Sequence, residues 1–242
     1  MLKNINLNLL NPPKYLHEDY SSFKYLIFDG TFLNRTESIV TLMNTEDQQI
    51  IAGAYGVRET SNSELYDFFI NLKHRGLNPL SLTVDGLKAV GVVIKAIWPD
   101  VTIQRCLVHI QRQGLQWCRV NPKRSDAKYL RKIFLMVANI RDSKDRNIFL
   151  GELRNWEEKY GLHIGKAKET GWVFSDIKRA RSMLLKAIPY MFHYLNDPRI
   201  PKTTNSLEGY FSRLKSKYRN HRGLSKLKRY NYFQWFFDLK RK

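Results

Sequence analysis

Cysteines, acidic residues and long apolar runs are scarce in this sequence. Its 242 residues include only two cysteines, Cys106 and Cys118, which excludes a disulfide-stabilised scaffold. No run of about 18 apolar residues is present, which argues against a membrane-spanning helix. The N-terminus also lacks the ordered basic flank, apolar stretch and small-residue site of a secretory signal. We therefore expect a soluble intracellular protein.

The shortage of acids leaves a strongly basic chain. Lys and Arg total 41 against 22 Asp and Glu, so the formal net charge is +19. A surface with this charge attracts polyanions and releases counterions when it neutralises phosphates. Nucleic acid is the leading candidate partner, and an anionic membrane surface or simple solubility are the alternatives. The basic residues are spread along the chain and mixed with aromatics, which favours nucleic acid over a membrane.

The hydrophobic content of 43% is enough for a folded core, and the length fits one large domain or one domain with an insertion. Residues 1–23 have the composition of a loop-like extension. Beyond them, apolar runs predict strands, and these are residues 24–29, 38–43, 49–55, 80–85 and 101–106. Helical spacing predicts a helix over 63–75, capped by Ser63, and another between Asp85 and about Ile97. This order predicts an α/β fold with a mixed five-stranded sheet flanked by helices.

The second half of the chain carries helical spacing and no convincing strand up to about residue 200. The predicted helices there are residues 110–118, 127–141, 146–160 and 177–194. One more helix opens near Asn205, and another lies within 224–240. We therefore expect an all-helical insertion into the α/β unit. The predicted division is an extension (1–23), a first core part (24–109), the insertion (110–200) and C-terminal core helices (201–242).

Two acids follow apolar strands, and each precedes a glycine. Asp29 and Asp85 stand where α/β sheets place their functional sites, at the carboxyl ends of strands. The alternative is a plain Asp-Gly turn at each position. Because two such acids occur in one predicted sheet, a shared site is the stronger hypothesis.

A third acid, Glu208, begins the helix near Asn205. It fits a near capping box with Asn205, which would explain both residues structurally. It also fits an inward carboxylate on a helix whose basic residues face an anion, and these are Arg213, Lys215, Lys217 and Arg219. Phosphodiester chemistry commonly uses two Mg²⁺ ions roughly 3.5–4 Å apart, held by a few carboxylates. Three converging acids on a +19 protein would suit that chemistry.

Four short motifs, taken in order, resemble the DDE transposases, which have a ribonuclease-H-like catalytic core. The motifs are Asp29-Gly30-Thr31-Phe32, Val84-Asp85-Gly86, Cys106-Leu107-Val108-His109 and Thr203-Thr204-Asn205-Ser206-Leu207-Glu208. More narrowly, they are similar to those of the Mutator-like transposases and their bacterial insertion-sequence relatives. The resemblance covers about residues 24–220.

The resemblance implies a chemistry and a set of residues. Asp29, Asp85 and Glu208 would be catalytic and would bind two Mg²⁺ or Mn²⁺ ions. The reaction would be hydrolysis at transposon ends, followed by attack of the freed 3′-hydroxyl on target DNA. The partner would be DNA, bound by a homodimer without membrane contact, at the nucleoid in a bacterium or in the nucleus of a eukaryote.

Three interpretations are open for Cys106 and His109. The first is a buried cysteine and a histidine whose hydrogen bonds are satisfied within the core, and the second is a zinc site that also uses Cys118. The third, which the resemblance implies, is a pair beside the catalytic centre.

Aromatic and basic residues of the insertion are candidate DNA contacts. Trp117, Trp156 and Trp172 are expected to be core anchors, with Trp172 the candidate for stacking on a base. A basic run early in the insertion is either a solvated helix face or a phosphate contact. Its members are Lys123, Arg124, Lys128, Arg131 and Lys132.

Alternatives to a transposase catalytic domain stay open. Only 28 residues precede Asp29, and they show no cysteine pair or helix-turn-helix pattern that would recognise transposon ends. We therefore expect a chain that lacks an end-binding module. Two other functions fit the same fold: an inactive or domesticated DNA-binding fragment, and a ribonuclease-H-like nuclease that cuts but never joins.

Overall fold

The computed structural model of the protein describes residues 11–34, 37–166 and 171–241. The chain folds into two compact units. The first combines Met1–Ile103 with Arg199–Lys242, and the second comprises Gln104–Pro198. The expected limits of the insertion, 110 and 200, differ from this division by a few residues.

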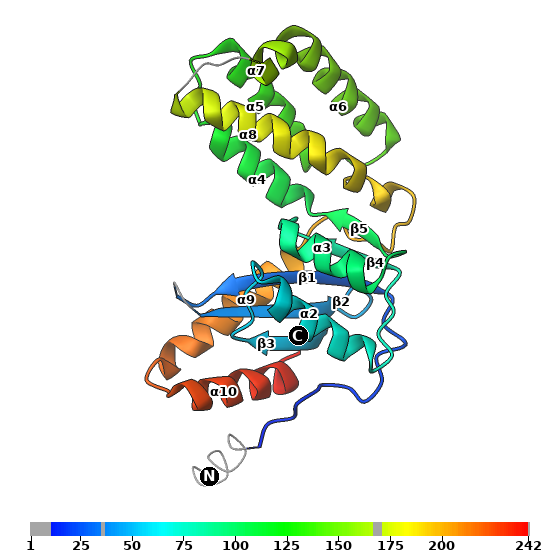
Figure 1. Cartoon of the computed structure of the whole chain (residues 1–242), viewed down its shortest axis with the longest axis vertical. Helices are drawn as coiled ribbons and strands as arrows, with labels where there is room; N and C mark the ends of the chain where they lie inside the picture. The colour runs from blue at the N-terminus through cyan, green and yellow to red at the C-terminus, as the bar shows by residue number, and fades with distance from the viewer. Residues whose placement is uncertain (1–10, 35–36, 167–170, 242) are drawn as a thin grey trace. The chain divides into compact units, whose positions relative to one another are not determined.

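A five-stranded mixed sheet forms the centre of the first unit, in the order β3-β2-β1-β4-β5 (Figure 1). The strands are β1 (Tyr25–Phe32), β2 (Ser38–Asn44), β3 (Ile50–Tyr55), β4 (Ser81–Val84) and β5 (Thr102–Arg105). β1, β2 and β3 form an antiparallel meander, whereas β4 pairs with β1 in parallel. The predicted mixed five-stranded sheet is therefore confirmed.

The first strand is longer than its apolar run predicts. The expected strand stops at Asp29, but β1 continues to Phe32 because its pairing with β2 runs on through Gly30↔Val40 and Phe32↔Ser38. Asp29 thus lies inside a paired strand. The interpretation of Asp29-Gly30 as a turn is wrong.

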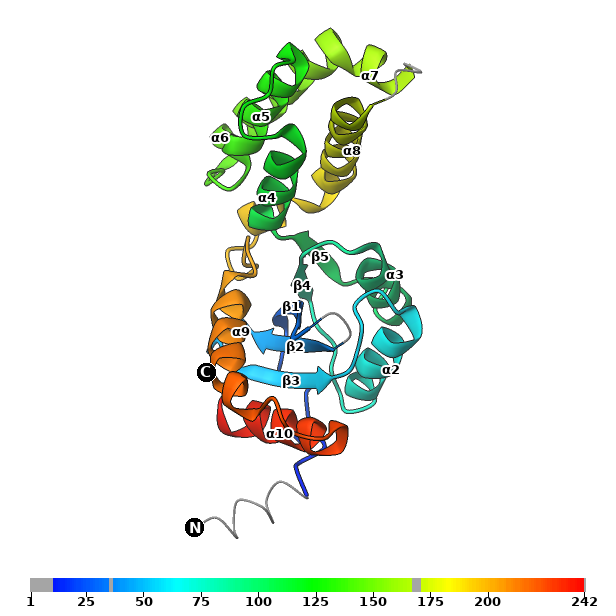
Figure 2. The ribbon, with the colours of Figure 1, turned by 90° about the vertical axis from the view of Figure 1, so that its left-hand side faces the viewer.

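Helices cover both faces of the sheet (Figure 2). Alternate residues of a strand point to opposite faces. Leu26 and Phe28 pack with α2 (Asn62–Lys73) and α3 (Lys88–Ile97), whereas Ile27 packs with α9 (Asn205–Tyr218) and α10 (Lys226–Leu239). Each face therefore has its own hydrophobic core.

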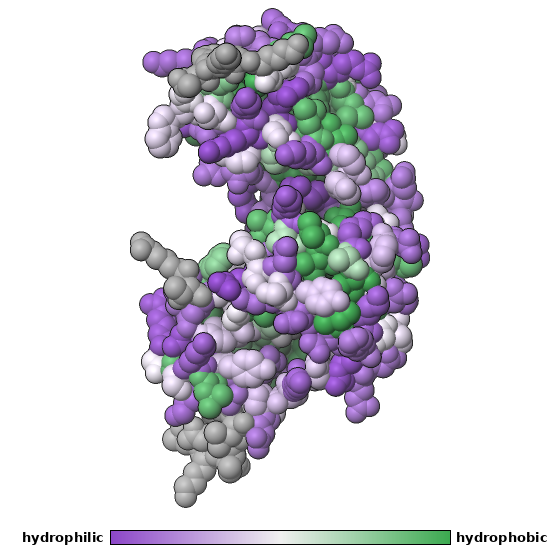
Figure 3. Space-filling view, viewed as in Figure 1, coloured by the Kyte–Doolittle hydropathy of each residue, from purple (hydrophilic) through white to green (hydrophobic). Residues whose placement is uncertain are grey.

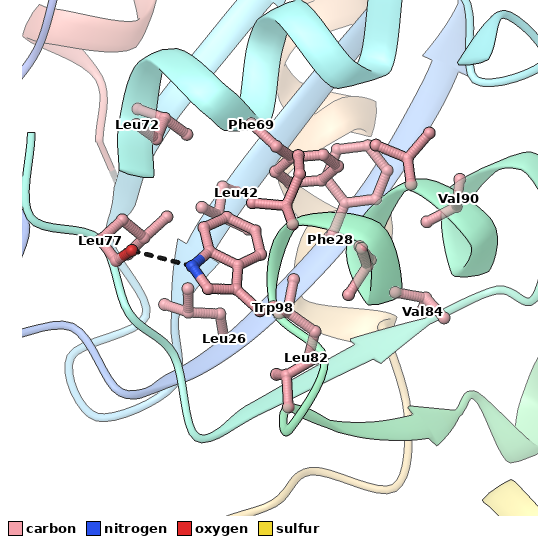
Figure 4. Packing of buried hydrophobic residues seen from close by; sticks show 14 of the residues in the cluster. Leu26, Phe28, Leu42, Phe69, Leu72, Leu77, Leu82, Val84, Val90 and Trp98 are labelled. Carbon is pink, nitrogen blue, oxygen red and sulfur yellow. Dashed lines mark hydrogen bonds between the residues drawn. The ribbon is translucent and has the colours of Figure 1, made fainter. Parts of the chain in front are cut away.

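Trp98 joins the elements on the α2 and α3 side. Its indole lies among Leu26, Leu72 and Leu82, and its Nε1 donates a hydrogen bond of 3.0 Å to the carbonyl oxygen of Leu77 (Figure 4). Phe69 of α2 meets the Trp98 ring edge-on at 5.8 Å between ring centroids. A buried tryptophan whose N–H has a partner is a stable anchor.

Apart from Gln104 and Arg105, which end β5, the regular elements among the described residues of the second unit are all helices, as predicted from residue 110 on. Its main helices are α4 (Leu107–Cys118), α5 (Ser125–Val137), α6 (Ser143–Trp156), α7 (Leu162–Lys166) and α8 (Trp172–Ala187). Trp156 is fully buried and donates a hydrogen bond of 2.9 Å to the carbonyl oxygen of Asp126. The expected helix over 177–194 instead begins at Trp172 and ends at Ala187. A short 3₁₀ turn with Pro189 follows it, since proline lacks the N–H that an α-helix needs.

Candidate active site

Asp29 and Asp85 are brought together by the parallel pairing of β1 with β4. The register pairs Leu26 with Leu82 and Ile27 with Thr83. Two residues further along both strands, Asp29 and Asp85 come side by side. The two acids that the sequence singled out therefore meet.

A backbone N–H holds one oxygen of each aspartate. Gly30 N donates to Asp29 Oδ1 and Leu87 N donates to Asp85 Oδ1, both at 2.9 Å. Gly86 has a φ of 98°, a left-handed conformation that glycine adopts without strain. Asp85 and Gly86 begin the short loop between β4 and α3, and the hydrogen bond from Leu87 N fixes the orientation of the Asp85 carboxylate in that loop.

Glu59 supplies a third carboxylate, which was not among the residues predicted from the sequence. Asp29, Glu59 and Asp85 each offer one oxygen, and these atoms all lie within 4.8 Å of one another. We call these three residues the carboxylate cluster. Only 6% of Asp29 and 7% of Glu59 is exposed, and Asp85 is half-buried. Among the described residues, this is the one set of His, Cys, Asp and Glu side chains close enough to hold a metal ion.

The loop between β3 and α2 places Glu59. Arg58 next to it binds Glu64 through its guanidinium and its backbone N–H, the latter at 2.7 Å. Ser61, not the predicted Ser63, caps α2 by accepting from Glu64 N. Val57 accepts a hydrogen bond of 2.6 Å from Ser38 Oγ on β2. The loop is thus tied to both neighbouring elements on either side of Glu59.

Thr41 lies beside the carboxylate cluster with its hydroxyl unused. It pairs with Asp29 across β1 and β2, so the two side chains share one face of the sheet. Thr41 is fully buried, and its Oγ1 makes no hydrogen bond to the part of the chain that the structure describes. Buried hydroxyls normally have a partner, so this one indicates a site that a ligand or water completes.

Glu208 lies in the first turn of α9, outside the carboxylate cluster. The predicted capping box is wrong, because Thr204 stands at the N-cap and makes no side-chain capping bond there. Leu207 and Phe211 pack under the same sheet face as Ile27, and Glu208 is half-buried. The catalytic role of Glu208 stays a prediction.

The structure does not bring Cys106, His109 and Cys118 together as a metal site. Both cysteines are buried at opposite ends of α4, and His109 is half-buried. Because an α-helix rises about 1.5 Å per residue, α4 separates the two cysteines by about 18 Å along its axis, too far for both to bind one zinc ion. The zinc interpretation is therefore wrong, and the role of Cys106 and His109 stays untested.

The other predicted contacts lie at the surface of their own units. Arg213, Lys217 and Arg219 are exposed and Lys215 is half-buried, along α9 and its C-cap. In the second unit Lys132 is exposed and Arg131 half-buried on α5, while Arg124 pairs with Asp126 at 2.8 Å. Trp172 is 86% exposed, so it is not the core anchor that Trp156 is. Their contact with DNA stays a prediction.

The amino-acid sequence matches that of a known family over most of its length. A sequence model described as "Transposase, Mutator family" matches residues 20–223, a range that contains the carboxylate cluster and Glu208. The chain belongs to the Mutator family of transposases. The predicted family is confirmed.

Two bacterial insertion-sequence transposases are similar to this Mutator-family chain. One is the transposase for insertion sequence element ISRM3 of Rhizobium meliloti (strain 1021), and the other is the probable transposase for an ISRM3-like element of Sinorhizobium fredii (strain NBRC 101917 / NGR234). Each is 24% identical over 189 residues, which are 77% of this chain and 43% of the relative. The chain thus spans less than half the length of these relatives.

Two observations concern the alternative that the basic chain binds a membrane. Hydrophilic side chains cover most of the face shown in Figure 3. No helix within the described residues is long and apolar enough to cross a bilayer.

Proposed function

We propose that this Mutator-family chain is a transposase catalytic core with a ribonuclease-H-like sheet. It would cleave DNA at transposon ends and join the freed 3′-hydroxyl to target DNA. The observation that carries this proposal is the meeting of Asp29 and Asp85 at one edge of the sheet, in a chain of a transposase family. The names of the relatives support DNA transposition as the biological process.

The donor set suits a hard divalent cation. Carboxylate oxygens are the protein ligands that Mg²⁺ and Mn²⁺ prefer, and two or three suffice because such ions keep several waters. The unused Thr41 hydroxyl beside Asp29 fits a site that an ion or its water completes. Two such ions, when bound, would supply activation of the attacking oxygen and stabilisation of the leaving oxygen of the phosphodiester.

The residues of the chain have separate tasks in this proposal. Asp29 and Asp85 would hold the cations, and the backbone N–H groups of Gly30 and Leu87 orient their carboxylates. Glu208 would supply a further carboxylate for the metal site from α9, which packs on the Asp29 side of the sheet. No side-chain nucleophile takes part, because water and then the DNA 3′-hydroxyl attack.

DNA is the substrate and a second copy of the chain is the expected partner. The net charge of +19 and the basic residues along α9 suit the phosphate backbone. Concerted action on two transposon ends favours a homodimer.

Nicking of a supercoiled plasmid in Mg²⁺ or Mn²⁺ tests the chemistry without knowledge of the terminal repeats. Asp85→Asn keeps the size of the side chain but removes its charge, so cleavage should fall by about 100-fold or more. Binding to the same DNA, measured by mobility shift, should persist. Asp100→Asn is the matched control. Asp100 is exposed beyond α3, so this variant should cleave DNA as the wild type does.

The two alternatives predict different products. DNA binding without metal-dependent cleavage would contradict the catalytic proposal and support a DNA-binding fragment. Cleavage that Asp85→Asn abolishes, without joining of a labelled 3′-hydroxyl oligonucleotide to the plasmid, would support a nuclease instead.

A further inference from the structure

Glu59 reaches the carboxylate cluster from the loop between β3 and α2. β3 runs in the same direction as β1, because each is antiparallel to β2. The carboxyl ends of β1, β3 and β4 therefore share one edge of the sheet, and Glu59 follows β3 by four residues. The chain thus delivers three acids to this edge from three different strands.

Gly30 makes room for the Glu59 side chain. A Cβ atom at Gly30 would collide with the Cγ, the carboxyl carbon and an oxygen of Glu59. Because Gly30 follows Asp29 by one residue, that Cβ would point to the face covered by α2 and α3. Glu59 therefore approaches from the α2 side, whereas α9 carries Glu208 on the other face. Glu59 and Glu208 do not replace each other.

A cavity borders Glu59 on the α2 side of the sheet. Glu59 lines this cavity of about 420 Å³ together with residues from the starts of α2 and α3, including Leu87 and Lys88. Leu87 also supplies the N–H that holds Asp85. The cavity therefore lies next to two of the groups that build or orient the carboxylate cluster.

Electrostatics supplies the reason for a ligand at Glu59. Three carboxylates whose oxygens lie within 4.8 Å repel one another, and burial of Asp29 and Glu59 adds to the cost of their charges. A divalent cation offsets that cost. The unused Thr41 hydroxyl, on the Asp29 side, is an independent sign that this place takes a ligand.

We infer that Glu59 is a direct ligand of a divalent cation that it shares with Asp29 and Asp85. The inference rests on the proposed function, since it extends the same metal site by one residue. It assigns the α2-side ligand of the site to the β3–α2 loop, in addition to the acid predicted on α9.

Binding of Mn²⁺ to the full chain without DNA tests Glu59 independently of activity. Titration is followed by the electron paramagnetic resonance signal of free Mn²⁺. Glu59→Gln should weaken the tightest site by about 10- to 100-fold. Glu46→Gln is the matched control: Glu46 is exposed in the β2–β3 turn, and its loss should leave affinity unchanged.

Thermal melting separates a ligand from a merely structural residue. In EDTA, Glu59→Gln should melt at or above the wild-type temperature, because one of three like charges is gone. The rise in melting temperature on adding Mn²⁺ should shrink in the variant. A lower melting temperature in EDTA with an unchanged Mn²⁺ shift would overturn the inference.

Asp29→Asn distinguishes failure of the inference from failure of the proposed function. If Asp29→Asn loses Mn²⁺ and Glu59→Gln binds like the wild type, the inference is overturned and the proposed metal site stands. If the wild type binds no more tightly than Asp29→Asn, the proposed site and the inference both fail. Comparable losses in both variants, with Glu46→Gln unaffected, support both.

Discussion

Gly30 illustrates how one residue without a side chain determines where another can lie. In β1 a glycine normally costs stability, because it has more freedom to lose on folding than other residues. Here the missing Cβ is the space that the Glu59 carboxyl fills. Glu59 can approach Asp29 because Gly30, the next residue of β1, has no side chain in the space that Glu59 occupies.

Gly30→Ala should therefore destabilise the chain in a way that depends on Glu59. We expect a loss of about 1–3 kcal/mol in the free energy of unfolding, since the new methyl must displace a buried side chain. In the Glu59→Ala background the space is free, and the same change should cost less than about 0.5 kcal/mol. Urea denaturation of the four proteins in this cycle measures the coupling. Equal costs in both backgrounds would show that the two residues do not compete for space.

The site residues differ in how readily they can be predicted from the sequence. Asp29 and Asp85 were predictable because each directly follows a buried apolar run, and parallel pairing then places them side by side. Glu59 carries no such mark, since it stands in a polar loop four residues beyond β3. The signal for it was the direction of the strand: the third strand of a meander runs parallel to the first, so its loop opens at the same edge.

At the scale of elements, types were predictable and ends were not. Hydrophobic period gave the five strands and the helical character of the second unit. Hydrogen bonding decided the ends: cross-strand pairing carried β1 past Asp29, and a π-helical segment over Glu157–Gly161 follows α6. The predicted N-cap residues of α2 and α9 were wrong. Several Ser, Thr and Asn residues lie near the start of each helix, and any of them could cap it.

Two helical glycines of the second unit should respond oppositely to one substitution. A Cβ at Gly114 in α4 would collide with the fully buried Phe134 ring of α5, whereas one at Gly151 in α6 would meet nothing within 4 Å. Gly114→Ala should destabilise by about 1–3 kcal/mol through overpacking. Gly151→Ala should stabilise by about 0.5–1 kcal/mol through helix propensity.

Urea midpoints by far-ultraviolet circular dichroism, taken on the whole chain, measure both changes. Each variant is the control for the other, because both replace a helical glycine by alanine in the same unit. Stabilisation by both would mean that α4 and α5 are not packed closely at Gly114.

For the molecule as a whole, charge was predictable from composition, but its placement was not. The net charge of +19 predicted a polyanionic partner, and the family supports DNA. Only the structure shows which basic side chains are exposed and which are engaged in ion pairs. Arg213, Lys217 and Arg219 are exposed beside a buried stripe of α9, whereas Arg124 of the second unit is engaged with Asp126.

The salt dependence of DNA binding should reveal whether the basic residues of α9 contact phosphates. Each phosphate contact contributes about 0.9 to the slope of log K against log salt concentration. Replacing Arg213, Lys215, Lys217 and Arg219 by Gln should therefore lower the slope by about 3–4, with little effect on helicity since Gln is a good helix former.

A second fourfold variant removes the same charge from elsewhere. Its exposed targets in the second unit are Lys144, Arg154, Lys159 and Lys186. The slope should fall by about 1 or less in this variant, because a general loss of charge is screened beyond roughly 8–10 Å while direct phosphate contacts are counted one by one. Fluorescence anisotropy with a labelled duplex over a salt series gives both slopes. Equal reductions in the two variants would contradict a local DNA surface on α9 and assign binding to net charge alone.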